Sequence, residues 1–257
     1  MALPMLRPLA VGEILDVSFS LYRRHFGVLA TIALLCSGLP LALRLFLETS
    51  GGMYGNPALS LVYFVLTVVL SLIATAATVF VVSESYLGRP ITAREALGRA
   101  SPYVGRILVC TILMTLAIGV GVMLLIVPGI ILAVGLVLTV PVVVLEPSRG
   151  ASATLSRSWE LTRGGRWRIF GLMATLLVLL YVPVVAIGGL AAVLLPRMGG
   201  VMGSGVFAGV FGLAIGGLVQ VFIYPLFYCV LTVAYYDQRV RKEGFDLELL
   251  ASSLQPA

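Results

Sequence analysis

The stretch at residues 107–145 reads ILVCTILMTLAIGVGVMLLIVPGIILAVGLVLTVPVVVL and contains no charged residue. A helix that crosses a bilayer needs about 20 apolar residues, so this stretch is nearly twice as long as one span. Pro128 and Gly129 lie near its middle and favour a tight turn. The stretch therefore predicts two membrane-spanning helices, at about 107–127 and 130–145, rather than one long kinked helix.

The rest of the chain has the same apolar character. Its 257 residues are 60% hydrophobic and 11% charged, with a mean hydropathy of +1.10. Because a soluble domain carries roughly 25% charged residues, this composition excludes disorder, a coiled coil and almost any water-soluble enzyme. The other stretches long enough to span a bilayer bring the expected number of spans to six: 26–46, 58–82, 169–195 and 206–235.

The basic residues gather between alternate spans, and only Arg44 and Arg197 fall on the other side. Loops rich in arginine and lysine remain in the cytoplasm, so both termini are expected there, in a protein integral to the cytoplasmic membrane. This placement also accounts for the net charge of +6 without a nucleic-acid partner. The first residues lack a basic segment followed by an apolar core, so no cleaved signal peptide is expected.

Three segments on the basic side predict short amphipathic helices that lie in the membrane interface. They are Val11–Arg24, a segment that begins with a capping box at 92–95, and residues 151–163. Leu15, Leu97 and Leu155 align along these segments. A second aligned set comprises Ser18, Ala100 and Ser158.

The alignment predicts three repeats within one polytopic membrane domain, residues 1–257. The repeats cover about 10–86, 91–146 and 151–241, and each comprises an interfacial helix and a hairpin of two spans. A cytoplasmic tail follows over 238–257. Because the three copies share one topology, a pseudo-threefold axis along the membrane normal is expected, in contrast to the inverted repeats of many transporters.

Each even-numbered span ends near an acidic residue on the cytoplasmic side, and each odd-numbered span opens with an arginine. These six residues are Glu84, Glu146 and Asp237, and Arg24, Arg106 and Arg166. The acids are expected to pair with the arginines. Two interpretations remain open: the pairs pin the interfacial helices at the membrane boundary, or they form a polar ring that binds an anionic headgroup or a partner.

The residues that carry chemistry are scarce in this sequence. His25 is the single histidine and is expected at a span entrance. The cysteines form no CxxC pair, and no zinc-protease, nucleophile-elbow or phosphate-loop pattern occurs. The sequence therefore predicts no catalytic or metal site and no cofactor.

Four glycines of the sixth expected span recur at helical spacing: Gly205, Gly209, Gly212 and Gly216. A row of small residues lets two membrane helices approach closely. Close packing within the fold is the first interpretation, and homodimerisation through the same row is the alternative.

Several segments carry a family resemblance. They are residues 7–26 (RPLAVGEILDVSFSLYRRHF), the VPGI turn at 127–130, the runs LSRSWELTRG at 155–164 and RWRIF at 166–170, and YYDQRVRKEGFDLELL at 235–250. Together they resemble the membrane domain family of glycerophosphoryl diester phosphodiesterase. The resemblance covers nearly the whole chain.

What the resemblance implies is a membrane domain rather than an activity. The family takes its name from proteins that fuse this domain to a soluble catalytic barrel, which uses paired histidines and metal-binding carboxylates. His25 has no second histidine beside it, so no catalytic residue is carried over and we expect the stand-alone form of the domain.

Three functions follow as expectations. The first is a non-enzymatic module that anchors, scaffolds or presents lipid to a partner at the cytoplasmic face, with anionic headgroups among its ligands. The second is a permease or channel for a small or lipidic substrate, for which kinked spans enclose a pore. The third, with the weakest support from the residues, is a lipid-modifying membrane enzyme.

Overall fold

The computed structural model describes residues 7–49, 56–89, 91–146, 150–194, 197, 211, 212, 215–217, 219–245 and 247. These residues are helical and include no strand. Six helical segments are long and apolar enough to cross a membrane. The prediction of an all-α membrane protein with six spans is therefore confirmed.

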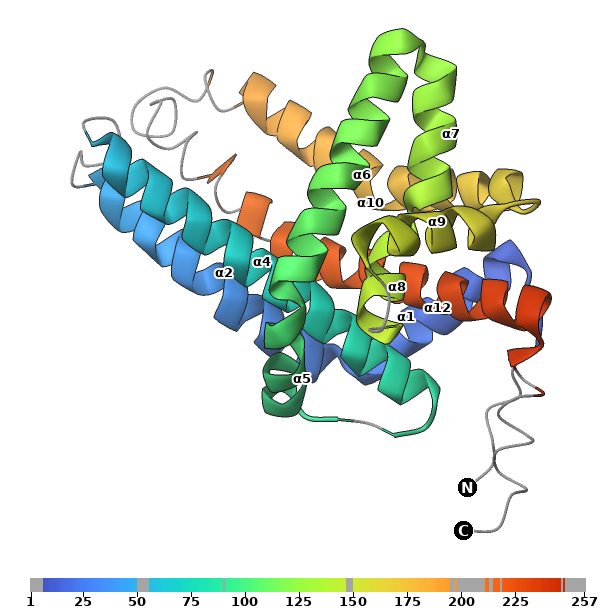
Figure 1. Ribbon diagram of the computed structural model, residues 1–257. Helices are drawn as coiled ribbons and strands as arrows, with labels where there is room; N and C mark the ends of the chain where they lie inside the picture. The colour runs from blue at the N-terminus through green and yellow to red at the C-terminus, as the bar shows by residue number, and fades with distance from the viewer. Residues whose placement is uncertain are drawn as a thin grey trace.

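The spans follow one another as α2 (Phe26–Thr49), α4 (Pro57–Tyr86), α6 (Val104–Leu124), α7 (Ile126–Leu136) with α8 (Thr139–Leu145), α10 (Arg166–Leu194), and a last span, Ile215–Glu243, that contains η3 (Val219–Ile223) and α12 (Tyr224–Glu243). Figure 1 shows α2 beside α4 and α6 beside α7, each pair reaching away from a cluster of shorter helices. The full arrangement of three hairpins remains a prediction.

The turn between the third and fourth spans lies earlier than the sequence predicts. The chain reverses at Leu125, whose backbone is extended, and Pro128 and Gly129 belong to the first turn of α7. A proline is tolerated there because the first turn of a helix needs no N–H from it. Gly129 lets α7 approach α6 closely, since a Cβ at this position would lie 2.8 Å from the backbone nitrogen of Val122.

Three short helices precede spans at the positions that the amphipathic pattern predicts. They are α1 (Val11–Arg24), α5 (Ala93–Ala100), which leads through η1 (Ser101–Tyr103) into α6, and α9 (Ala151–Thr162). The capping box of α5 forms: the Thr92 hydroxyl accepts a hydrogen bond from the Glu95 N–H, and the Glu95 carboxylate accepts one from the Thr92 N–H at 2.9 Å.

The aligned positions of these three helices are buried alike. Ser18, Ala100 and Ser158 are completely shielded from solvent. The positions four residues earlier, which carry different side chains, are also buried: Ile14, Ala96 and Thr154. The positions two residues before the serine–alanine–serine set are exposed in all three helices. This shared burial pattern supports the predicted repeat, which otherwise remains a prediction.

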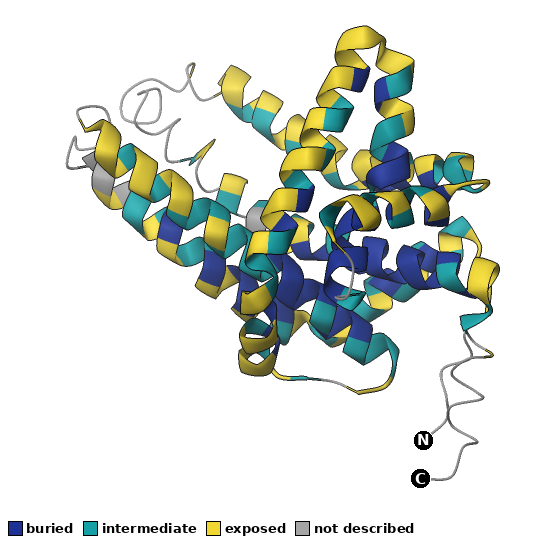
Figure 2. Ribbon diagram, viewed as in Figure 1, coloured by how far each residue is buried: buried dark blue, intermediate teal, exposed yellow. Residues whose placement is uncertain are grey.

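The core lies where the even-numbered spans meet. Helices α4, α8 and α12 contact one another pairwise, and Figure 2 shows the buried residues concentrated at this end of the molecule. Side chains that are fully shielded come from all three spans: Ala76, Val79, Leu138, Val142, Cys229 and Val233. By contrast, α6 and α10 expose large apolar side chains such as Leu116 and Val185, as expected for surfaces that face lipid.

The three helices predicted to lie in the interface, α1, α5 and α9, are called the interfacial helices, and each packs against the end of an even-numbered span. Helix α5 packs on α4, α9 packs on α8, and α1 packs on α12. The last of these contacts joins the two ends of the chain. The three interfacial helices therefore lie around the packed ends of the even-numbered spans, which we call the inner spans.

Candidate functional site

One end of the molecule carries Glu84, Glu146 and Asp237 together with the arginines that contact them, and we call it the basic face. The three acids lie at or near the ends of α4, α8 and α12. Each of them contacts an arginine from another part of the chain. The ion pairs thus connect the inner spans to the helices around them.

Glu84 is the most exposed of the three carboxylates. Arg99 of α5 donates to its Oε1 at 3.2 Å, and Arg89 lies 3.5 Å from its Oε2. Both arginines are largely solvent-exposed, so water screens these contacts. The pair connects α4 to the interfacial helix that follows it in the chain.

Glu146 is more enclosed and has partners from two helices. The Arg157 Nε of α9 donates to both carboxylate oxygens at 3.2 Å, and the Tyr235 hydroxyl of α12 donates at 2.9 Å. Arg157 also contacts Glu243 at the end of α12. Burial opposes the charged form of Arg157, but its contacts with Glu243 and Glu146 outweigh burial and raise the pKa of Arg157 above its usual value.

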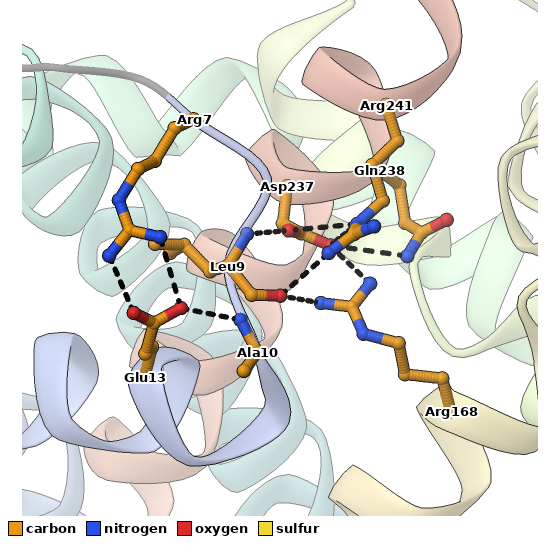
Figure 3. Close-up of polar contacts among 8 residues, drawn as sticks. All are labelled: Arg7, Leu9, Ala10, Glu13, Arg168, Asp237, Gln238 and Arg241. Carbon is orange, nitrogen blue, oxygen red and sulfur yellow. Dashed lines mark hydrogen bonds and ion pairs between the residues drawn. The ribbon is translucent and has the colours of Figure 1, made fainter.

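Asp237 is the most heavily contacted of the three acids, and its side chain is completely buried (Figure 3). It accepts hydrogen bonds from the Leu9 N–H at 2.8 Å, from Arg168 of α10 at 2.6 Å and from Arg241 at 3.2 Å. The two arginines also donate to the Leu9 carbonyl. Both backbone groups of Leu9 are therefore held by α10 and α12.

The residues on both sides of Leu9 take part in a second set of polar contacts. Arg7 donates to the Glu13 carboxylate at 2.5 Å, and the other oxygen of Glu13 accepts from the Ala10 N–H at 2.7 Å (Figure 3). These hydrogen bonds lower the pKa of Glu13. The segment before α1 is thus held by Glu13 of the first turn of α1 and by the Asp237 cluster, which comprises Asp237, Arg168 and Arg241.

Three arginines that the sequence pattern does not single out contact the acids: Arg99, Arg157 and Arg168. The predicted pairing of the acids with Arg24, Arg106 and Arg166 stays a prediction. Arg24 lies exposed at the end of α1. The guanidinium of Arg166 lies 3.6 Å from the centre of the Trp159 ring, and its Nε is buried without a hydrogen-bond partner.

Two of these partners occupy an aligned position that could have been noticed. Arg99 follows Leu97 by two residues, and Arg157 follows Leu155 by two residues. The equivalent residue of the first predicted repeat is Val17, which cannot pair with an acid. Asp237 instead contacts the backbone of Leu9, Arg168 of α10 and Arg241 of its own helix.

Arg106 lines a hollow where α5 turns into α6. The hollow has a volume of about 480 Å³, and its other lining residues are Phe80, Arg99, Pro102 and Tyr103. The rings of Phe80 and Tyr103 meet edge to face with centroids 5.6 Å apart. The two guanidinium groups suit the phosphate group of a lipid. The aromatic rings beside them suit the apolar part of the same lipid, which continues into the membrane.

The start of α10 presents a second feature typical of a membrane interface. Trp167 is 86% exposed and lies between Arg166 and Arg168 in the sequence. Tryptophan is enriched at the level of lipid headgroups, and arginine there favours anionic lipid. The feature indicates that this end of α10 lies at the edge of the bilayer.

The structure describes the glycine row of the last span only in part. Gly205 and Gly209 lie outside the described residues. At Gly212 and Gly216, an added Cβ would have no described atom within 4 Å, and both residues line a cavity. Close packing through the row, within the fold or between two copies, stays a prediction.

The described histidine, cysteine, aspartate and glutamate residues lie apart from one another with respect to metal binding. No cluster of three such side chains occurs in that part of the chain. The cysteines Cys36, Cys110 and Cys229 are buried and unbridged.

Comparison with known families matches this chain over the part that builds most of the basic face. The model described as the membrane domain of glycerophosphoryl diester phosphodiesterase matches residues 104–253, which include α9, Asp237 and its two arginines. The chain belongs to this family. The resemblance suggested by the sequence segments is thereby confirmed.

Two relatives of this chain carry the name UPF0259 membrane protein. The relative from Pectobacterium carotovorum is 36% identical over 77 residues, 30% of each chain. The relative from Photorhabdus laumondii is 35% identical over 74 residues, 29% of this chain and 28% of that one. The matches thus span less than a third of the relatives' length. No solved structure matches the chain.

Proposed function

We propose that this membrane-domain protein is a non-enzymatic module that binds anionic lipid at its basic face and anchors or presents it to a partner. The observation that carries the proposal is the hollow between α4 and the α5–α6 turn. It combines Arg99 and Arg106 with the aromatic rings of Phe80 and Tyr103. The guanidinium groups suit the phosphate of a phospholipid, and the aromatic rings suit the apolar atoms beside that phosphate.

The proposal places the basic face and both ends of the chain in the cytoplasm, with the protein in the cytoplasmic membrane. Leu9 and Asp237 are in direct contact, so both ends of the described chain lie on one side of the molecule, as an even number of spans requires. The excess of arginine on that side favours the cytoplasm. It also favours the anionic headgroups of the inner leaflet.

The state of the carboxylates supports a binding role over an enzymatic one. Glu84, Glu146 and Asp237 each accept hydrogen bonds from arginine, which fixes their side chains in place. A general base must instead reach a substrate proton with an oxygen that is free to accept it. The acids are thus better suited to holding helices together than to proton transfer.

A permease is the second candidate function, and one observation favours it. A cavity of about 740 Å³ lies between α2, α4 and the last span. A pore between the even-numbered spans is disfavoured where they pack together, because buried side chains such as Val79, Val142 and Val233 lie there. A lipid-modifying enzyme would gain support only from turnover of a glycerophosphodiester that is lost in His25→Ala.

The first experiment is native mass spectrometry of protein released gently from its own membrane. A stoichiometric anionic lipid or a second protein bound to the wild-type chain is expected. The Arg99→Gln/Arg106→Gln double variant should lose the anionic lipid, whereas Arg94→Gln, on the same helix but outside the hollow, should retain it. Equal lipid retention by all three proteins, with no protein partner, would contradict the proposal and make vesicle transport assays the next step.

A further inference from the structure

The cavity that favours the permease lies in the hydrophobic part of the molecule, apart from the basic face. One side of α2 lines it along most of the helix. The lining positions recur at helical spacing and include Phe26, Leu34, Leu41 and Arg44. At a rise of about 1.5 Å per residue, the distance from Phe26 to Arg44 is about 27 Å, close to the thickness of a hydrocarbon core.

The ends of the cavity differ in chemistry. At one end, Phe26 stacks on Phe222 of η3 with ring centroids 5.7 Å apart, and this end lies beside α1. At the other end is Arg44, one of the two arginines that fall outside the basic segments of the sequence. The cavity is therefore mainly apolar, with Arg44 at the end remote from the basic face.

The wall formed by α4 contains hydroxyl groups, and two of them donate to carbonyls of α4 itself. Thr67 donates to the Tyr63 carbonyl, and Ser71 donates to the Val68 carbonyl, both at 2.8 Å. Hydroxyls bonded to their own backbone do not require a polar ligand. The middle of the cavity is thus suited to a hydrocarbon chain.

The last span forms the third wall of the cavity and contains glycines and a widened helical turn there. Gly212 and Gly216 line the cavity, and a Cβ at either would have no described atom within 4 Å. The π-helical turn η3 lies directly before Pro225, whose missing N–H interrupts the regular helical hydrogen bonds. Both features leave space beside part of α2, and Gly217 approaches α2, since an added Cβ there would lie 3.5 Å from Leu41 Cδ2.

We propose that this cavity binds one acyl chain of an anionic phospholipid, with the phosphate held near Arg44. A volume of about 740 Å³ is within the range of ligand cavities, roughly 300–1,000 Å³. The cavity is long enough to hold an acyl chain that lies parallel to the spans, and the cation at its end favours an anionic headgroup. This site is independent of the proposed function, because its cation lies at the opposite end from the basic face.

The test uses photolabelling in lipid bilayers. The full chain is reconstituted into nanodiscs that contain phosphatidylglycerol or phosphatidylcholine with a diazirine in the acyl chain. Labelled residues are located by mass spectrometry on α2, on α4 and on the exposed α6 surface around Leu116, which reports bulk lipid. The measured quantity is cavity labelling divided by α6 labelling for each lipid.

We expect the ratio to be about fivefold higher for phosphatidylglycerol, the effect of one favourable charge contact near the membrane surface. Arg44→Gln should remove the preference and Arg44→Lys should keep it. Gly216→Leu should abolish cavity labelling with both lipids, because its side chain fills the space. Gly188→Leu, at a position of α10 that is equally open and far from the cavity lining, should leave both ratios unchanged.

Three outcomes would overturn the proposal. They are equal ratios for the two lipids in the wild-type chain, absence of cavity labelling with either lipid, and cavity labelling that persists in Gly216→Leu. Loss of the basic-face lipid in the Arg99→Gln/Arg106→Gln variant should not alter cavity labelling. The two sites therefore stand or fall separately.

Discussion

At the scale of single residues, Asp237 shows how a charge is accommodated near the end of a membrane span. Its side chain is completely buried, yet two guanidinium groups and the Leu9 N–H surround it. A buried carboxylate is tolerated only when its hydrogen bonds are made. Glu84 has the same role at the end of α4 but lies in contact with water. The two acids should differ in their contributions to stability.

The first prediction compares these two acids. Asp237→Asn leaves Arg168 and Arg241 without a counter-charge and should lower stability by about 3 kcal/mol. Glu84→Gln breaks an exposed pair and should cost less than about 1 kcal/mol. Thermal unfolding in one detergent should rank them accordingly, with a clearly larger loss of Tm for Asp237→Asn. Equal losses would show that the Asp237 cluster does not hold α1, α10 and α12 together.

The second prediction concerns His25, at the junction of α1 and α2. Burial, and then the charge of Arg24, lower the pKa of His25 below its usual value. The unfolded chain therefore binds the proton at a higher pH than the folded chain does. Stability should be unaffected well above the usual pKa of about 6.5, fall as the pH drops through that value, and level off below the folded pKa.

The measurement is Tm against pH, between about 7.5 and 5.5, where ordinary carboxylates remain ionised. His25 is the single histidine of the chain, so His25→Gln should flatten the profile. A slope that survives this substitution would assign the pH dependence to another group.

At the scale of secondary-structure elements, the close contacts are made by glycines that the sequence pattern did not single out. Gly135 of α7 faces α9, where an added Cβ would lie 2.3 Å from the Trp159 ring. The Gly135 carbonyl also accepts hydrogen bonds from Ser158 and Thr162 of α9, both at 3.1 Å. The interfacial helix is thus held against the span by an aromatic ring and two hydroxyls.

The third prediction follows from this contact. Gly135→Ala should force Trp159 away from α7 and lower stability by about 1–3 kcal/mol. Gly119→Ala is the matched control, because α6 leaves open space around that position and alanine is the better helix former. Unfolding in detergent should show a loss for the first variant and none for the second. A neutral Gly135→Ala would mean that α9 adjusts freely on α7.

At the scale of the whole molecule, the ring of interfacial helices around the inner spans relates distant parts of the chain. Ser18 and Ser158 are separated by most of the sequence, yet both are fully buried at the aligned position of their helices. Ser20 and Ser156 are exposed on the same helices. If the repeat is structural, the buried positions should respond alike to one substitution.

The fourth prediction tests this equivalence. Ser18→Leu and Ser158→Leu should each lower stability by about 1–3 kcal/mol, because leucine overfills a packed site. Ser20→Leu and Ser156→Leu should be close to neutral, since their side chains reach solvent or lipid. Tm values of the four variants provide the comparison. A large loss at one serine without the other would argue that the two helices are not equivalent.

The six spans and the three short amphipathic helices beside them could be predicted from local sequence patterns. A bilayer demands about 20 apolar residues per span, and an interfacial helix must alternate its faces, so both leave a local pattern. The positions of Glu84, Glu146 and Asp237 at span ends were readable for the same reason. The tertiary structure decided which arginines contact them, where the third span turns, and that Gly212 and Gly216 border a cavity. Those features depend on how distant helices pack, and contacts between distant segments leave no periodic trace in one sequence.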